Sequence, residues 1–306
     1  MWLALAFASA CLLGFYDVAK KRSLKDNAVV PVLFFNTLIS SVLFLPFLLG
    51  SQMGWIGADS VVYVPETTAA AQGAIAIKSA LVLSSWFFGY LGMKHLPLTL
   101  VGPINATRPI LVLLGAVFLF GETLNGLQWC GVGIAVTAFY LLSRSGRREG
   151  IDFQHNRWVL SVILACVLGA CCGLYDKYLM ASQASGGLGL NRMAVQTYYN
   201  VYQCAMMALM GAALWFPHRA HDVFRWKWSI VAISVFLSAA DFAYLYALSL
   251  DGAMIAIVSM VRRASVVVSF AFAAIVLHEK NLRSKALDLG LIVLSLVFLA
   301  LGTLSS

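Results

Sequence analysis

Four charged side chains lie deep inside long apolar stretches of this sequence, too far from a helix end to reach water easily: Arg108, Asp241, Arg262 and Arg263. An arginine near the centre of a membrane-spanning helix costs roughly 2.5–3.5 kcal/mol on insertion scales. Such residues therefore need a partner or a ligand, and by default they mark functional paths. Three arginines against one aspartate leave an excess of positive charge, which a bound anion would neutralise.

The positions of Asp241 and Arg262 predict an ion pair between neighbouring helices. The turn that joins their helices lies near Asp251, ten residues after Asp241 and eleven residues before Arg262. At about 1.5 Å per residue both side chains lie about 15 Å from that turn, and hence at equal depth on antiparallel helices. Arg263 points about 100° away from Arg262, so the two arginines cannot face Asp241 equally well.

Arg108 lies in a segment with a different local chemistry, "VGPINATRP" at residues 101–109. Pro103 and Pro109 lack a backbone N–H, so this helix is expected to be kinked or broken at mid-membrane. Irregular backbone at that depth is tolerated where it is buried in protein or lines a cavity. The preceding helix has Trp86 at the corresponding depth and carries no acid. The natural counter-charge of Arg108 is therefore a ligand.

Aromatic and amide side chains near these charges complete a candidate site. Trp86 and Tyr90 share one helix face, as do Asp241 and Tyr244, although such stripes are more often packing than a substrate platform. The predicted substrate-binding residues are Arg108, Arg263, Arg262, Asn105, Asp241, Trp86, Tyr90 and Tyr244. Two acids nearer to helix ends are candidates for coupling to protons, Asp17 and Asp176.

A purely structural role for the arginines is the rival interpretation. In that case they bond to backbone carbonyls or to the amide side chains of Asn105, Asn36 or Asn200. For Arg108 and Arg263 the two interpretations have about equal weight, because intramembrane charges are so often functional. Arg262 is the arginine for which the structural role is favoured.

The composition indicates what kind of element carries these residues. The chain has 306 residues, of which 61% are hydrophobic and 11% charged, and its mean hydropathy is +0.86. Soluble domains average about 25% charged residues, so this chain is expected to be an all-α integral membrane protein. Ten apolar stretches are long enough to cross a bilayer: residues 2–19, 29–50, 74–94, 98–120, 124–143, 157–181, 192–216, 227–249, 253–277 and 284–304.

Motifs of catalysis and of tightly bound cofactors are missing from the sequence. No HExxH, GxSxG or Walker A pattern occurs, and the five histidines all lie at predicted loops or helix ends. The six cysteines form no CxxC pair and are expected to be packing residues. The sequence therefore predicts no enzyme, no catalytic residue, no cofactor and no metal site.

The two halves of the chain repeat each other. "GFYDVAKK" at residues 14–21 corresponds to "GLYDKYLM" at 173–180, and "FFN" at 34–36 corresponds to "YYN" at 198–200. Glu122 and Gly133 recur in the same order as Glu279 and Gly290. Two similar halves of five helices must enter the membrane from opposite sides, which predicts ten transmembrane helices as two inverted five-helix repeats. The predicted boundaries are 1–145 for the first repeat, 146–156 for a basic connecting loop, and 157–306 for the second repeat.

These motifs resemble the EamA family of the drug/metabolite transporter superfamily. The two five-helix halves, each with a glutamate (Glu122, Glu279) in the turn before a last helix that contains glycine, carry the resemblance, and "YALSLDGAMIAIVS" at 246–259 is the most similar stretch. The resemblance implies a permease for small molecules. With the excess of positive charge, the expected function is secondary transport of a small polar, anionic or carboxylate-bearing metabolite by alternating access. The alternative is proton-coupled export of cationic or amphipathic compounds.

The distribution of basic residues predicts the orientation in the membrane. Of 21 Lys and Arg, 15 lie in or beside the odd-numbered loops, and only Lys78 and Arg192 flank the even-numbered ones. The positive-inside rule then places the odd loops in the cytoplasm and both termini outside it, for a multi-pass protein of the cell membrane. The net charge of +8 reflects orientation and contact with anionic lipid, so no nucleic-acid partner is expected. The expected partners are a small-molecule substrate and the bilayer, and the sequence does not decide between a monomer and a homodimer.

Overall fold

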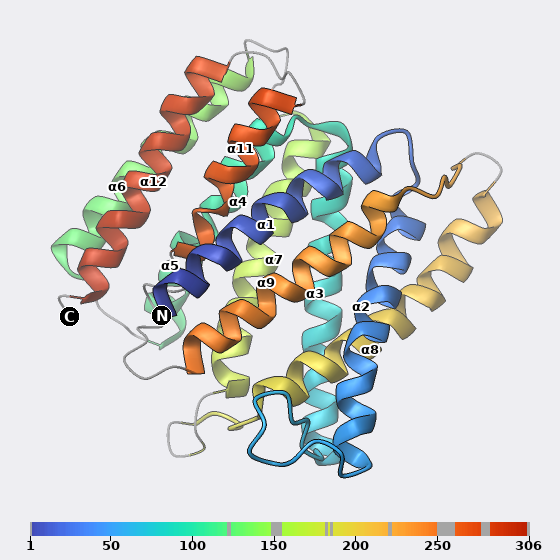
Figure 1. The fold of residues 1–306 in the computed structure, drawn as a ribbon. Coiled ribbons are helices and arrows are strands. Elements are labelled where there is room, and N and C mark those ends of the chain that lie inside the picture. Colours follow the sequence, from blue (N-terminus) through green and yellow to red (C-terminus); the bar gives the residue numbers. More distant parts are fainter. Residues whose placement is uncertain are drawn as a thin grey trace.

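The protein is a bundle of helices packed side by side (Figure 1). A computed structural model describes residues 2–120, 124–147, 155–180, 183, 186–219, 222–249, 261–276 and 282–304. Within these ranges all regular secondary structure is helical and no strand occurs. The expected all-α class is therefore confirmed. The predicted turn residues Glu122, Glu279 and Asp251 lie outside the described ranges, as does most of the predicted connecting loop.

Six helices make up the first half of the chain, and two of them form one broken span. They are α1 (Trp2–Leu24), α2 (Val29–Gln52), α3 (Ala69–His95), α4 (Leu98–Ala106), α5 (Arg108–Phe120) and α6 (Gly126–Arg147). Thr68 caps α3, because its side chain accepts a hydrogen bond from the N–H of Ala71. Several helices extend beyond the apolar stretches from which they were predicted, and α1 and α3 carry lysines in these extensions or close to them.

The second half follows a similar order. Its described helices are α7 (Arg157–Met180), α8 (Arg192–Met210), the π-helical turn η2 (Gly211–Trp215), the short 3-10 helix η3 (Phe216–His218), α9 (Trp228–Ser249), α11 (Ser265–Val276) and α12 (Leu282–Leu304). Asn191 caps α8 by accepting hydrogen bonds from the N–H groups of Met193 and Ala194.

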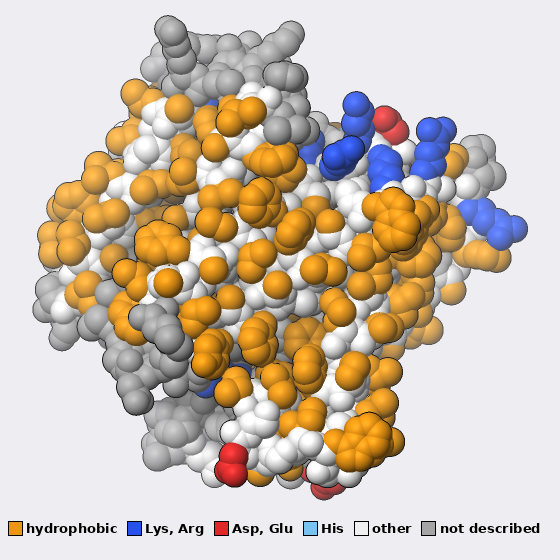
Figure 2. Space-filling view, viewed as in Figure 1, with side chains coloured by type: hydrophobic (Ala, Val, Ile, Leu, Met, Phe, Trp, Pro, Cys, Tyr) orange, Lys and Arg blue, Asp and Glu red, His pale blue; other side chains and the backbone are white. Residues whose placement is uncertain are grey.

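The surface matches the surroundings that a membrane provides. Five helical segments are long and apolar enough to cross a bilayer: Trp2–Leu24, Val29–Gln52, Ala69–His95, Arg157–Asp176 and Lys285–Gly302. Two shorter apolar segments are Gly126–Leu142 and Trp228–Tyr244. Hydrophobic side chains cover the broad face of the bundle, and Lys and Arg side chains gather at one end of it (Figure 2). Arg22, Lys25 and Arg225 are exposed there, around the turn between α1 and α2.

Two helical stretches are each interrupted at one residue. The helix that contains α4 and α5 breaks at Thr107, whose N–H donates to the carbonyl of Ile104 at 3.2 Å. This confirms the break expected from Pro103 and Pro109. A second break lies at Ala264, immediately before α11, where the N–H donates to the carbonyl of Val261 at 3.0 Å. The sequence analysis treated residues 253–277 as one span and did not anticipate this break.

Helices from the two halves pack against each other in pairs. The principal contacts join α1 with α9, α3 with α7, α2 with α8, and α6 with α12 (Figure 1). Serine hydroxyls bridge two of these pairs: Ser9 donates to the carbonyl of Ala240, and Ser85 to that of Ala165, each at 2.7 Å. Because hydroxyl-to-carbonyl bonds and small residues let backbones approach closely, these pairs are tightly joined within the membrane. These two pairs, α1 with α9 and α3 with α7, line a cavity at the centre of the bundle.

Candidate functional site

The broken helices and the paired helices enclose a central cavity of about 270 Å³. Its lining comes from α1, α3, α7, α9 and the segments on either side of both helix breaks. Eight of the ten predicted site residues line it: Trp86, Tyr90, Asn105, Arg108, Asp241, Arg262, Arg263 and Asp17. Tyr244 and Asp176 instead line an adjoining cavity. The structure thus brings most of the predicted residues together, while their roles stay predictions.

The two breaks place the arginines at this cavity. Arg108 is the first residue of α5, directly after the break at Thr107. The hydroxyl of Thr107 donates to the carbonyl of Ile104 at 2.7 Å and satisfies one of the acceptors that the break leaves open. Arg262 and Arg263 directly precede the break at Ala264. Each break therefore brings a guanidinium to the central cavity beside irregular backbone.

Arg262 has the partner that the sequence predicted. Its Nη2 donates to Oδ1 of Asp241, and both side chains are 19% exposed. The guanidinium also lies over the ring of Tyr244, with Cζ 4.4 Å from the ring centroid. Its Nε is buried and has no hydrogen-bond partner among the described residues. The predicted Asp241–Arg262 pair is confirmed, with a donor of the arginine left over.

Arg108 and Arg263 have no such partner. No ion pair between the described residues includes either of them. The Nε of Arg108 is buried without an acceptor in the part of the chain that the structure describes. Its guanidinium lies against α7 at Gly169, where an added Cβ would come within 2.6 Å of Nη2. A glycine at this position thus makes room for the Arg108 guanidinium. Among the described residues Asn105 forms no hydrogen bond with either arginine, so the alternative in which it pairs with them has no support.

Lys20 is a site residue that the sequence analysis missed. It was assigned to the first cytoplasmic loop, but α1 continues past it and its side chain lines the central cavity. Its Nζ lies 3.1 Å from Oδ1 of Asp17, and it lies over the rings of Tyr16 and Tyr90 at 4.5 and 5.2 Å. The spacing of Asp17 and Lys20, three residues apart on one helix, was the available signal. Asp17 is therefore a neutralised acid and not an isolated one.

Two further lysines lie deeper than their positions near loops suggested. Lys285 is completely buried in α12, and its Nζ donates to the hydroxyl of Thr99 in α4 at 2.8 Å. Lys78 is buried in α3 and lies 2.5 Å from Oδ1 of Asp176 in α7. The charge count placed both lysines in or beside loops, although each lies near the start of a predicted apolar stretch, because the count considered position along the chain and not burial.

The formal charge of the central cavity is positive. Four basic side chains line it, Lys20, Arg108, Arg262 and Arg263, against the two acids Asp17 and Asp241. Each acid is already paired with one of these bases. The remaining charge belongs to Arg108 and Arg263, so the arrangement can bind an anion without displacing an internal ion pair.

An all-helical bundle with apolar spans around a charged cavity defines a multi-pass membrane protein. Residues 1–144 match the model of the EamA-like transporter family, which confirms for the first half of the chain the family resemblance expected from the sequence. This match points to a membrane transporter of the drug/metabolite superfamily.

Similarity to solved structures extends over the whole fold. One solved structure, described as "Crystal structure of protein", aligns with a TM-score of 0.62 over 98% of this chain and 97% of that chain. The two sequences are 16% identical, so this likeness concerns the fold alone. No curated protein matches the sequence.

Proposed function

We propose that this protein is a secondary transporter that moves a small anionic, carboxylate-bearing metabolite across the cell membrane. The observation that carries the proposal is the positive charge of Arg108 and Arg263 in the central cavity, which no acid among the described residues pairs with. A guanidinium presents several N–H donors in a planar fork that matches a carboxylate. A carboxylate would therefore supply both the missing charge and the missing acceptors.

The broken helices add to this preference for an anion. Arg108 begins α5 and Ser265 begins α11, and both residues line the central cavity. The N-terminus of a helix carries a partial positive charge and free N–H groups, which favour anionic ligands. Transporters with discontinuous helices use such ends to hold charged substrate groups near the bilayer midplane.

The helix contacts support ten spans arranged as two inverted repeats. If α1 and α7 are equivalent, and α3 and α9 are equivalent, the contact of α1 with α9 corresponds to the contact of α7 with α3. The contact of α1 with α11 likewise corresponds to that of α7 with α5, and α2 with α8 corresponds to itself. A pseudo-two-fold axis in the plane of the membrane relates one half to the other and therefore gives each contact between the halves an equivalent contact. We infer repeats at 1–145 and 157–306, joined by residues 146–156.

The different closure of the two ends supports transport by alternating access. Toward the turn between α1 and α2, the cavity ends at a densely packed layer in which Tyr90, Met93, Leu96 and Leu98 are almost completely buried. Lys21 closes this layer by donating to the carbonyls of Met93 and Leu96. Toward the opposite side a second cavity adjoins the central one, sharing Asp241 and Arg262 with it, and a third cavity adjoins the second at Arg192. Transport then requires the packed layer to open while the other side closes.

The alternative, export of cationic compounds, is less well supported. It requires an acid that is free to bind the cation or its coupling protons. The acids that line the central cavity and the cavity next to it, Asp17, Asp176 and Asp241, are each paired with a basic side chain. A cation entering the central cavity would also meet two unpaired arginines, so like-charge repulsion opposes it.

The proposal is tested first by ligand-induced stabilisation of the purified protein. Succinate, glutamine and putrescine represent the anionic, zwitterionic and cationic classes, each compared with sodium chloride at equal ionic strength. We expect succinate to raise the melting temperature most and the Arg108→Ala variant to lose this shift. Stabilisation by putrescine alone would contradict the proposal and favour the cationic alternative.

Orientation is tested separately with a reporter fused to the C-terminus. A reporter that is active only in the cytoplasm is expected to stay dark, because the basic loops place both termini outside. A bright signal would reverse the orientation without affecting the proposed substrate class.

A further inference from the structure

A second cavity, the side chamber, adjoins the central cavity across the Asp241–Arg262 ion pair. The side chamber has a volume of about 180 Å³ and lies among α3, α7, α8 and α9. Asp241 and Arg262 line both cavities, so this ion pair forms part of the wall between them. A solute that moves from one cavity to the other must pass the Arg262 guanidinium.

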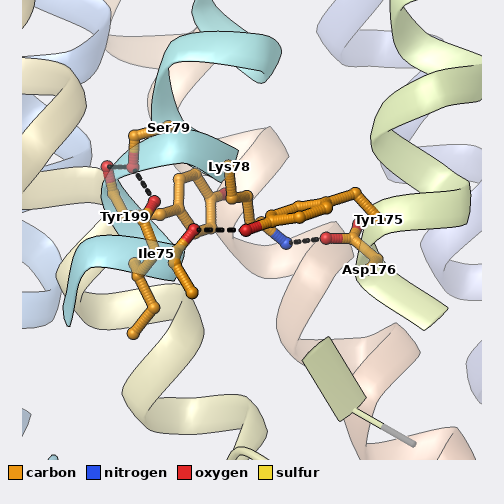
Figure 3. Close-up of polar contacts among 7 residues, drawn as sticks. Ile75, Lys78, Ser79, Tyr175, Asp176 and Tyr199 are labelled. Carbon is orange, nitrogen blue, oxygen red and sulfur yellow. Dashed lines mark hydrogen bonds and ion pairs between the residues drawn. The ribbon is translucent and has the colours of Figure 1, made fainter. Parts of the chain in front are cut away.

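The side chamber has a built-in cation of its own. Lys78 reaches from α3 toward α7, where its Nζ donates to Oδ1 of Asp176 at 2.5 Å (Figure 3). The Lys78 side chain is 8% exposed, and its Nζ lies 5.2 Å from the centroid of the Tyr199 ring. An ammonium group has three N–H donors, and Asp176 accepts one of them. The pair therefore fixes the position of the ammonium while donors remain for a ligand.

The backbone around Lys78 is fixed by further hydrogen bonds. Ser79 donates to the carbonyl of Ile75 at 2.8 Å and to that of Tyr199 at 3.4 Å, and so connects α3 to α8 (Figure 3). The hydroxyl of Tyr175 in α7 donates to the carbonyl of Ala74 at 3.2 Å. Since α3, α7 and α8 are tied together at this level, the ammonium lies in a rigid frame. A preorganised group of this kind loses little entropy on binding a ligand.

Charges continue from the side chamber toward the loop between α2 and α3. A third cavity of about 200 Å³, the loop cavity, lies between that loop, the start of α8 and α9. Its lining residues are Ala58, Ser60, Val61, Tyr63, Asn191, Arg192, Met193, Phe242 and Tyr246. Arg192 lines both the loop cavity and the side chamber. Along the path from the loop cavity through the side chamber to the central cavity, the basic side chains are therefore Arg192, then Lys78, then Arg262.

We propose that the side chamber is a second binding site for the carboxylate of the transported metabolite, with Lys78 as the cation that holds it. The inference rests on the proposed function and extends it, since it adds a station between the loop cavity and the central cavity. The metabolite passes from Lys78 to Arg108 and Arg263 by way of Arg262, so that its negative charge is never far from a cation in the low-dielectric interior.

A structural tie between α3 and α7 is the competing role for the Lys78–Asp176 pair. A tie alone gives the side chamber no affinity for anions, because each charge is then satisfied by the other. The two roles are separated by measuring the charge preference of the chamber directly. Charged thiol reagents report it, since their reaction rates with a cysteine follow the local electrostatic potential.

The experiment uses a cysteine-free background, in which the six native cysteines are replaced and ligand-induced stabilisation is verified. Single cysteines are then introduced as Val82→Cys in the side chamber, Ser265→Cys in the central cavity and Met53→Cys on the exposed surface outside these cavities. Rates are measured with the anionic sulfonatoethyl and the cationic trimethylammonioethyl methanethiosulfonate. The quantity compared is the ratio of the two reaction rates, anionic over cationic reagent. The Met53→Cys variant supplies the reference value of this ratio.

We expect the anionic reagent to be favoured at Val82→Cys by roughly three- to tenfold relative to the reference. Adding Lys78→Gln should bring the ratio to the reference value or below, and adding Asp176→Asn should raise it. Succinate should slow the reaction at Val82→Cys more than sodium chloride of equal ionic strength does, and Lys78→Gln should remove this protection. If Lys78→Gln does not fold, the opposite shift in Asp176→Asn still tests the inference.

Different failures have different meanings. No reaction at Val82→Cys, no preference for the anionic reagent, or no protection by succinate overturns the second site. If Ser265→Cys nevertheless shows both preference and protection, the proposed anion transport stands and only the side chamber loses its role. If neither cysteine shows them, the proposed function fails as well.

Discussion

The two helix breaks have similar backbones and different charge arrangements. At Thr107 and at Ala264 the N–H donates to the carbonyl three residues earlier, and Ala264 follows Thr107 at the same separation as Gly290 follows Gly133. Beside the second break, Arg262 is paired with Asp241 of α9. Beside the first, Arg108 has no acid partner among the described residues. Beside one helix break the arginine therefore stabilises the fold through an ion pair, and beside the other the arginine is available to bind a ligand.

The difference originates in the helices that precede the breaks. In the second half α9 supplies Asp241, whereas in the first half α3 has Trp86 near the corresponding position. Trp86 lines the central cavity but provides no negative charge. The lack of an acid on α3 leaves Arg108 as one of the two arginines that give the cavity its positive excess, the other being Arg263. Four variants break or sharpen this comparison.

The largest effect is expected for Arg262→Ala. Removing one partner of a buried ion pair costs roughly 3–5 kcal/mol, because the other charge is left uncompensated. Asp241 would be that charge, and we expect the melting temperature and the yield of folded protein to fall. Adding Asp241→Ala should restore part of both, which a loss of packing alone would not allow. A normal melting temperature for Arg262→Ala would show that the pair does not stabilise the fold.

Arg108→Ala should have the opposite profile. Since Arg108 pairs with no described acid, its removal is expected to leave the melting temperature of the ligand-free protein nearly unchanged. A hydrogen bond to a charged group contributes roughly 1.5–3 kcal/mol, so affinity for an anion should fall by roughly ten- to a hundredfold. Uptake into proteoliposomes and succinate-induced stabilisation measure the loss. Normal uptake by this variant would remove Arg108 from the site.

The sequence predicted the features that helix geometry or proline chemistry determines. Equal depth on antiparallel helices led to the Asp241–Arg262 pair, and two prolines indicated the break at Thr107. The break at Ala264 has neither proline nor glycine beside it and depends on packing between helices, which no local pattern encodes.

The buried lysines show a second limit of the sequence. Lys20 follows the predicted stretch 2–19 and Lys78 lies close to the start of the stretch 74–94, so both were placed beside loops, although α1 and α3 include them. A lysine placed near the end of an apolar stretch can either reach the interface or turn inward to an acid. Only the neighbouring helices decide between these outcomes, as α7 does for Lys78 through Asp176.

Asp241→Asn makes the second half resemble the first. It frees the Arg262 guanidinium from its negative partner and removes one negative charge from the central cavity. We expect the ligand-free protein to be less stable by roughly 1–3 kcal/mol and the affinity for succinate to rise by roughly three- to tenfold. Isothermal titration of wild type and variant measures the second effect. Unchanged or weaker succinate binding would mean that Asp241 does not compete with the ligand for Arg262.

The smallest effect is expected for Gly169→Ala, which leaves every charge in place and changes only the position of Arg108. A Cβ at residue 169 would lie within 2.6 Å of Nη2 of Arg108, closer than side chains tolerate. Because the clash is with the end of a flexible side chain, the guanidinium should move aside and the fold should lose little stability. Misplacing the guanidinium by a fraction of an ångström to an ångström should weaken succinate binding, by roughly two- to fivefold, less than its removal does. In the Arg108→Ala background the same substitution should have no further effect on binding, since no guanidinium remains to be displaced. An equal loss in both backgrounds would show that Gly169 acts through α7 packing and not through Arg108.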